Sequence, residues 1–374
     1  MVRILFIVPS LQFGGLENAQ INLANALVEN GYDVTVMTYG SEDDLLERLD
    51  KRVRYIYKPF KAHKLMKRIP YIRHKFYDDG MWETRVSAKT LYKYYVGNED
   101  YDIEIAYFRG LAIKIISGST NTHSTKLAFV HSDFEKCVGI TNNFRNMEDT
   151  VKAYSKFDRI VCVSEKVRES FSKIIGFPEK TVTINNIIPA DSITLLSKET
   201  VDIEKTGFTV ITVGHIIPLK GHKRLIDSVI KLHIERYDIS LWIVGDGICR
   251  SELEEYTNGY DYIRFLGMQS NPYRFISKAD MYVCSSFYEG FPLTVCEAMI
   301  CGTPVLSTKC AGSCEILDNG EYGMITENSE EGIFQGLKEL LTNTKLLKEY
   351  REKLPDRISY FDKDTIIKKI TGLF

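Results

Sequence analysis

The stretch SSFYEGFPLTVCEAMICGTP, residues 285–304, decides the fold of the second half of this chain. The apolar run MYVC just before it, residues 281–284, predicts a buried strand. Pro292 and Gly302 then bracket a helix, because proline favours the first helical position and glycine follows the last. The strand therefore leads into a helix N-terminus, whose free N–H groups and partial positive charge suit a phosphate. Gly290 lets the backbone approach such a ligand closely.

Two carboxylates flank this predicted helix mouth. Glu289 precedes the helix, and Glu297 lies inside it, about 8 Å along the axis at ~1.5 Å rise per residue. This spacing lets one carboxylate serve each end of a nucleotide sugar, although spacing alone favours an ordinary loop glutamate and a solvent-exposed helical one. The surrounding pattern changes the balance, because EGFPLxxxEAMxxGxPV resembles the signature of the family-four retaining glycosyltransferases of GT-B fold.

The resemblance implies a role for each end of this motif. Glu289 would contact the hydroxyls of the donor sugar, and Glu297 would contact those of the ribose. The helix mouth would hold the donor diphosphate through Gly290, Phe291, Pro292 and Leu293.

Length and composition predict two ordinary globular domains. The chain has 374 residues, more than one hydrophobic core usually serves, with 44% hydrophobic and 26% charged residues. Residues 1–190 hold 27 Lys+Arg and 23 Asp+Glu, a net charge of +4, so the remainder, with 21 and 27, is −6. The resemblance implies an acceptor-side domain over 1–190, a nucleotide-sugar domain over 191–356, and a C-terminal helix over about 357–374 that packs back on the first domain.

Cysteine usage and hydropathy predict a cytoplasmic protein. The eight cysteines are scattered and form no CxxC pair, so packed free thiols are expected instead of disulfides or zinc ligands. No run of about 18 apolar residues predicts a transmembrane helix. The apolar N-terminus soon meets Pro9, as expected of a first strand and not of a signal sequence.

A glycine loop follows the first predicted strand, residues 2–8. Open α/β sheets bind ligands at this strand end. A Gly-Gly pair is explained equally well by a tight turn. Within the resemblance, Gly14, Gly15 and Glu17 match the Gly-Gly-x-Glu loop that approaches the donor phosphate and the acceptor.

His131 follows the predicted strand at 126–130. A lone histidine is more often structural, but one placed beyond a strand end can donate hydrogen bonds or carry charge. Its position matches the histidine that lines the donor sugar in the resembling family.

A basic segment spans residues 48–75, with eleven Lys or Arg against one acidic residue. Four cations share roughly one helical side and suit an anionic membrane surface, where each contributes ~1 kcal/mol: Lys61, Lys64, Lys67 and Arg68. A solvated basic loop explains the segment nearly as well. Nucleic acid is not expected as a partner, because no recognisable nucleic-acid module accompanies the charge.

The second half opens with a predicted strand at 208–213 and the loop GHIIPLKGH. This loop resembles the family's Gly-Arg-Leu-x-Pro-x-Lys-Gly element, which implies that Gly214 approaches the diphosphate and Lys220 contacts it. His215 stands where the family usually has arginine. We expect its imidazole to hold a diphosphate less firmly than a bidentate guanidinium would. The resemblance also implies that backbone groups at Gly267 and Met268 hold the nucleotide base, and residues 311–313 resemble a second glycine turn of the phosphate pocket.

The sequence therefore predicts an α/β protein of GT-B fold, with two doubly wound Rossmann-like domains facing a central cleft. The reaction that the resemblance implies is retaining transfer of a sugar from a nucleotide diphosphate sugar, expected to be a UDP-sugar, to a saccharide acceptor, expected to be lipid-linked, in cell-surface polysaccharide or glycolipid synthesis. His131, Glu289 and Lys220 are the expected catalytic residues, with no metal or cofactor. The protein would act in the cytoplasm or at the inner membrane face. One alternative is another GT-B nucleotide-sugar enzyme, an epimerase or a transferase to a small soluble acceptor. A dinucleotide-binding oxidoreductase is disfavoured because no GxGxxG opens a βαβ unit.

Overall fold

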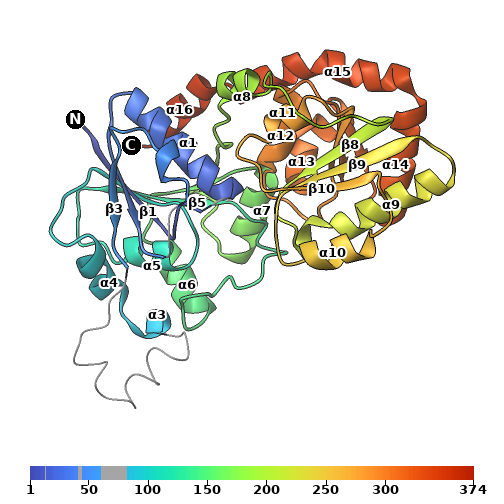
Figure 1. Ribbon diagram of the computed structural model, residues 1–374. Helices are drawn as coiled ribbons and strands as arrows, with labels where there is room; N and C mark the ends of the chain where they lie inside the picture. Colours follow the sequence, from blue (N-terminus) through green and yellow to red (C-terminus); the bar gives the residue numbers. More distant parts are fainter. Residues whose placement is uncertain (13, 41–43, 60–81) are drawn as a thin grey trace. The chain divides into compact units, whose positions relative to one another are not determined.

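The computed structural model describes residues 1–12, 14–40, 44–59 and 82–374, and it forms two compact units (Figure 1). Unit 1 comprises Met1–Asn186 and Asp364–Phe374, and unit 2 comprises Ile187–Lys363. The sequence placed these divisions after residues 190 and 356. The last helix of the chain is thus part of unit 1, and the helix before it is part of unit 2.

Unit 1 is built on a parallel sheet with the strand order β3-β2-β1-β4-β5-β6-β7. Its interior strand β1 reads RILFIV and is almost entirely buried, as expected where helices cover both faces of a parallel sheet. The order reverses between β1 and β4. The strands are β1 (Arg3–Val8), β2 (Asp33–Thr38), β3 (Arg54–Tyr57), β4 (Ile103–Ala106), β5 (Thr125–Val130), β6 (Arg159–Cys162) and β7 (Thr181–Thr183).

Helices connect these strands, as in any doubly wound sheet. Ser164 caps α7 as its type predicts, since its hydroxyl accepts from the Val167 N–H at 3.3 Å. The helices of unit 1 are α1 (Gly15–Glu29), α3 (Trp82–Arg85), α4 (Ala88–Tyr95), α5 (Leu111–Ser117), α6 (Met147–Tyr154), α7 (Glu165–Ile174) and α16 (Lys363–Thr371), with a 3₁₀ turn η1 at Leu46–Arg48.

Unit 2 repeats the architecture with the strand order β10-β9-β8-β11-β12-β13, again all parallel. The order reverses here between β8 and β11. The strands are β8 (Phe208–Val213), β9 (Ile239–Val244), β10 (Ile263–Gly267), β11 (Met281–Cys284), β12 (Val305–Thr308) and β13 (Met324–Thr326).

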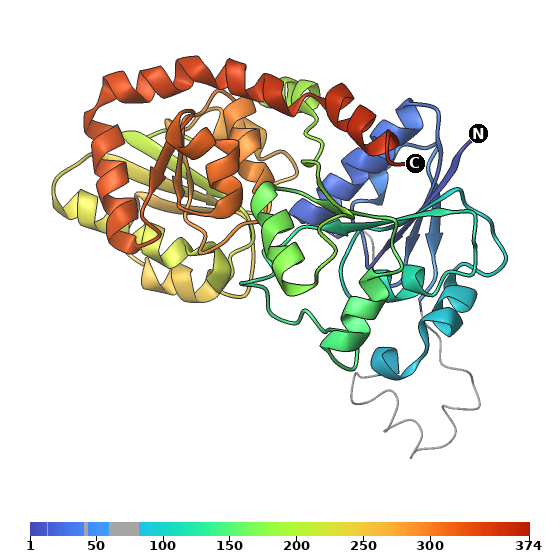
Figure 2. The ribbon, with the colours of Figure 1, turned by 180° about the vertical axis from the view of Figure 1, so that it is seen from behind.

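The helices of unit 2 cover both faces of its sheet (Figures 1 and 2). Helix α9 packs beside α14, and α12 packs against α8 and α15. The bounds are α8 (Ala190–Leu196), η4 (Pro218–Lys220), α9 (His222–Ile234), α10 (Arg250–Tyr256), α11 (Tyr273–Ile276), α12 (Leu293–Ile300), α13 (Ala311–Ile316), η5 (Asp318–Gly320), α14 (Glu330–Thr342), α15 (Thr344–Ile358) and η6 (Ser359–Phe361).

These two sheets confirm the predicted fold class of paired doubly wound α/β units. One local expectation was wrong, because residues 311–313 begin helix α13 and do not form a turn. All eight cysteines are free, as predicted. Within the described residues, no helix is both long and apolar enough to cross a bilayer.

Candidate functional site

The switch point of unit 2 brings two predicted ligand loops together. In open α/β sheets, ligands bind beyond the carboxyl ends of the strands where the strand order reverses. Strand β8 leads into Gly214 and the turn η4, and its neighbour β11 leads into the loop before α12. The two loops are joined directly, since the Phe287 N–H donates to the Leu219 carbonyl at 2.9 Å. The motif at residues 285–304 therefore lies at the strand ends where a ligand is expected to bind.

Lys220 and Glu289 meet at this point. The Lys220 ammonium donates to Glu289 Oε1 at 2.6 Å, and the Ser286 hydroxyl donates to the same oxygen at 2.6 Å. The side chains are 28% and 13% exposed, so one edge of the pair still meets solvent. Burial acts to lower the pKa of Lys220, but the adjacent Glu289 carboxylate outweighs it and the pKa is raised. Lys220 thus stays charged and is accessible to an anion that competes with Glu289.

Glycines let the surrounding backbone segments pack against one another. A Cβ on Gly245 would lie 2.0 Å from the Gly214 carbonyl oxygen, and Gly245 has φ +139°. A Cβ on Gly312 would lie 2.5 Å from the Gly290 carbonyl oxygen. The Gly312 N–H also donates to the Glu289 carbonyl at 3.2 Å. These contacts fix the loop after β8 and the loop after β11 against their neighbours.

The mouth of α12 presents backbone more than side chains. Phe291 is 7% exposed, and its ring packs 5.7 Å from that of Phe361, so its side chain belongs to the core of unit 2. Gly290 and Pro292 are buried too, while Leu293 is half-buried. Any contact of Phe291 with a phosphate would therefore be made by its main chain.

The remaining predicted donor residues lie around these loops. Glu297 is half-buried on α12 and accepts from the Tyr273 hydroxyl at 3.4 Å. His215 is exposed on the loop after β8. Gly267, with φ +67°, bonds through its carbonyl to the Gly245 N–H at 2.9 Å, and Met268 is 45% exposed.

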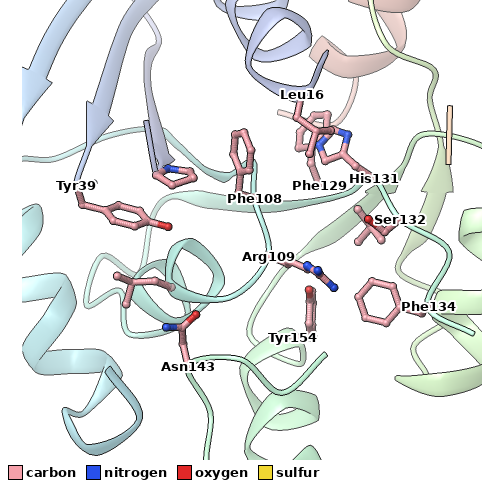
Figure 3. A pocket seen from close by; sticks show the side chains of 13 residues that line it. Leu16, Tyr39, Phe108, Arg109, Phe129, His131, Ser132, Phe134, Asn143 and Tyr154 are labelled. Atoms are coloured by element: carbon pink, nitrogen blue, oxygen red, sulfur yellow. The ribbon is translucent and has the colours of Figure 1, made fainter. Parts of the chain in front are cut away.

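Unit 1 has a pocket at its own switch point, between β1 and β4 (Figure 3). The pocket has a volume of about 280 Å³ and walls that are mainly apolar, with several aromatic rings and a few polar groups, as is usual for small-molecule sites. The aromatic members are Tyr39, Phe108, Phe129, Phe134 and Tyr154, and the polar ones are Arg109, His131, Ser132 and Asn143. His131, one of the expected catalytic residues, therefore lines this pocket.

His131 is held as a neutral ring. Its Nε2 lies 3.0 Å from the Tyr107 carbonyl oxygen, which can only accept, so Nε2 carries the proton. Burial lowers the pKa of His131 to about 4, and the hydrogen bond to Tyr107 opposes this only in part. The ring also stacks on Phe129 at an interplanar angle of 17°. This environment suits a wall of the pocket and not a group that carries charge near neutral pH.

The glycine loop of unit 1 begins helix α1. Gly14 is the N-cap with extended backbone, and a Cβ there would lie 2.1 Å from a carboxylate oxygen of Glu17. Glu17 thus folds back over Gly14, and burial raises the pKa of its carboxyl. Gly15 is exposed, with open space where a Cβ would be.

The predicted membrane-contacting residues lie outside the described part of the chain: Lys61, Lys64, Lys67 and Arg68. Among the residues that are described, no group of three His, Cys, Asp or Glu side chains gathers as metal ligands would.

Sequence reasoning missed Arg109 and Arg224. Arg109 lies in the unit 1 pocket beside Tyr154 (Figure 3), where it hydrogen-bonds to the Cys137 sulfur. Arg224 is buried at the start of α9, 7% exposed, and its Nε donates to the Ser285 carbonyl at 2.8 Å. Its position just before the apolar residues Leu225 and Ile226 was the only signal in the sequence.

Comparisons with known proteins match family profiles over both halves of the chain. Residues 13–192 match the family profile described as Glycosyltransferase Family 4, and residues 207–343 match the one described as Glycosyl transferases group 1. A crystal structure of Anabaena Alr3699/HepE in complex with UDP and glucose superposes with a TM-score of 0.76 at 18% identity, covering 100% of this chain and 99% of the other.

Two curated bacterial proteins illustrate the sequence similarity. The Campylobacter jejuni N-acetylgalactosamine-N,N'-diacetylbacillosaminyl-diphospho-undecaprenol 4-alpha-N-acetylgalactosaminyltransferase is 28% identical over 255 residues, covering 66% of this chain and 68% of that protein. The Rhizobium meliloti lipopolysaccharide core biosynthesis glycosyltransferase LpsE is 26% identical over 204 residues, covering 54% of this chain and 57% of that protein.

Proposed function

Because this chain belongs to the group 1 glycosyltransferases of GT-B fold, we propose that it moves a sugar from a UDP-sugar to a lipid-linked saccharide acceptor. The reaction would retain the configuration of the anomeric carbon and would serve cell-surface polysaccharide or glycolipid synthesis. The acceptor hydroxyl replaces the diphosphate at that carbon, and the products are the glycosylated acceptor, UDP and a proton.

The observation that carries the proposal is the Lys220–Glu289 pair at the switch point of unit 2. A partly exposed ammonium beside a helix mouth is suited to the charge that develops on a leaving diphosphate. Glu289, freed from Lys220 when the diphosphate binds, would accept hydrogen bonds from donor-sugar hydroxyls. Glu297, farther along α12, would accept from the ribose hydroxyls.

A uridine donor is supported by the neighbour of similar fold, whose structure contains UDP and glucose. A lipid-linked acceptor is supported by the name of the Campylobacter relative, which specifies a diphospho-undecaprenol substrate. The pocket of unit 1 is the site we assign to the acceptor saccharide, with the neutral His131 as part of its wall.

The test is a thermal-shift screen of the protein with UDP, GDP, ADP and their sugars, followed by a transfer assay. We expect UDP to raise the melting temperature more than GDP or ADP, because a ligand that binds only the folded state stabilises it. A transfer assay with the stabilising sugar nucleotide should release UDP only when a saccharide acceptor is present. Stabilisation by none of the nucleotides would refute the proposal.

Two further assays test whether the protein binds anionic membranes and whether it needs a metal ion. We propose that Lys61, Lys64, Lys67 and Arg68 bind anionic lipid, so the protein should float with anionic vesicles and not with neutral ones. We also propose that no metal is required, so transfer should persist in excess EDTA. Loss of activity in EDTA that returns with added divalent cation would contradict that second point.

A further inference from the structure

We propose that Arg224 is a positioning residue, which holds the loop after β11 in place and adds positive charge to the diphosphate site. The inference rests on the proposed function, since it concerns the site assigned there to the donor. Arg224 touches none of the expected reacting atoms and acts through Ser285 and the residues that follow.

The guanidinium of Arg224 is fixed on two sides. Its Nε donates to the Ser285 carbonyl at 2.8 Å, and its Nη2 donates to the same oxygen. Its central carbon lies 3.9 Å from the centroid of the Phe287 ring, within the range of a cation–π contact. Ser285 and Phe287 are therefore held by one side chain from helix α9.

These contacts lead directly to the candidate catalytic pair. The Ser285 hydroxyl donates to the Lys220 carbonyl at 2.9 Å. The next residue, Ser286, donates to Glu289 at 2.6 Å, and Glu289 accepts from Lys220. A displacement of the Ser285 carbonyl would thus move both partners of the pair.

The contact between Arg224 and the Ser285 carbonyl leaves no room for a side chain at Gly221. A Cβ on Gly221 would lie 2.3 Å from the Ser285 carbonyl oxygen and 2.7 Å from Arg224 Nε. Gly221 also has φ +64°, where L side chains are strained. The glycine at this position allows the guanidinium to reach the carbonyl.

Charge, in addition to geometry, points to a functional role. No carboxylate among the described residues forms a salt bridge with Arg224, although it is 7% exposed, and burial lowers the pKa of its guanidinium. A well-packed apolar side chain is often at least as stabilising as a buried charge, so stability alone does not explain an arginine here. Lys220 and Arg224 together carry one positive charge more than Glu289 balances, and a bound diphosphate would supply the missing negative charge.

The test compares Arg224→Met with Lys223→Met, using the full chain. Lys223 is the adjacent cation on the same helix, but it is 56% exposed and pairs with Asp227, so its loss serves as the matched control. Binding of UDP and of uridine is measured by calorimetry, and kcat and KM are measured by UDP release. We expect Arg224→Met to weaken the binding of UDP about tenfold and the binding of uridine by less than twofold, because the lost positive charge interacts with phosphates alone. Lys223→Met should leave all four values near those of the wild type.

A second variant separates positioning from charge. Arg224→Lys keeps a cation but cannot reproduce the planar pair of donors. We expect its UDP affinity to stay within about threefold of the wild type while kcat falls about tenfold. If Arg224→Met does not fold, the kcat of Arg224→Lys tests the positioning role on its own.

The outcomes distinguish this inference from the proposed function. If the wild type binds UDP, but Arg224→Met weakens UDP and uridine equally or weakens neither, the role of Arg224 is overturned and the proposed function stands. If the wild type binds no nucleotide, the proposed function fails first.

Discussion

Replacing Glu289 with glutamine tests the candidate pair most directly. The change keeps the size of the side chain and removes its charge, so Lys220 loses its ionic partner while Ser286 keeps an oxygen to donate to. Breaking a fully buried pair costs about 3–5 kcal/mol. The side chains here are 28% and 13% exposed, so we expect a smaller loss, about 2 kcal/mol in the free energy of unfolding of unit 2.

That loss should lower the melting temperature of unit 2 by about 4–8 °C, at about 2–4 °C per kcal/mol for a unit of this size. UDP affinity should be unchanged or higher, because the diphosphate no longer has to displace the Glu289 carboxylate from Lys220. The transfer rate kcat should fall about 10–100-fold, since charged hydrogen bonds to sugar hydroxyls are lost.

The assays are differential scanning fluorimetry with and without UDP, and UDP release at saturating donor. The double variant Lys220→Met, Glu289→Gln is the control for stability. It should recover part of the lost melting temperature, because neither charge is then left alone, and it should bind UDP weakly. If the Glu289→Gln variant bound UDP more weakly, or kept the melting temperature of the wild type, the inference that Glu289 and the diphosphate compete for Lys220 would be refuted.

Three further changes test other parts of unit 2. Glu297→Ala should raise the Kd for UDP about tenfold with little effect on kcat, measured by calorimetry and UDP release; the reverse pattern would show that the two glutamates were exchanged in our assignment. Burial lowers the pKa of His222 to about 4, so its neutral form stabilises the fold above pH 6.5 and this stability is lost as the pH falls toward 4. A His222→Leu variant should therefore lose less melting temperature between pH 7 and pH 4.5 than the wild type, and parallel curves would contradict this. Gly245→Ala should lower the melting temperature far more than Gly320→Ala, because both glycines have positive φ but only Gly245 would place a Cβ against backbone, at 2.0 Å; similar losses would show that the loop can shift.

Much of the fold could be predicted because parallel strands have a local signature. Runs such as MYVC in β11 are apolar throughout, and glycine or serine follows them at the turn into a helix. The Ser164 cap is equally local, since its hydroxyl bonds three residues along the chain. Each of these features depends on neighbours in sequence, which is why sequence patterns reveal them.

The contacts inside the site could not be predicted in the same way. Arg224 is buried because Ser285, 61 residues later, accepts its hydrogen bonds, and an arginine near a helix start normally faces water. The pairing of Lys220 with Glu289 joins loops 69 residues apart. The side chain of Phe291 belongs to the core because Phe361 packs on it, which no local pattern indicates.

The division of the chain has a consequence for how the protein is made. Unit 1 ends with α16, whose residues Ile366, Ile367 and Ile370 are almost fully buried, yet all of unit 2 is encoded before them. A ribosome working from the N-terminus therefore finishes the second unit while the first still lacks its closing segment. Those three isoleucines belong to a unit whose first segment ends at Asn186, so the N-terminal unit completes its folding last, against the usual order of synthesis.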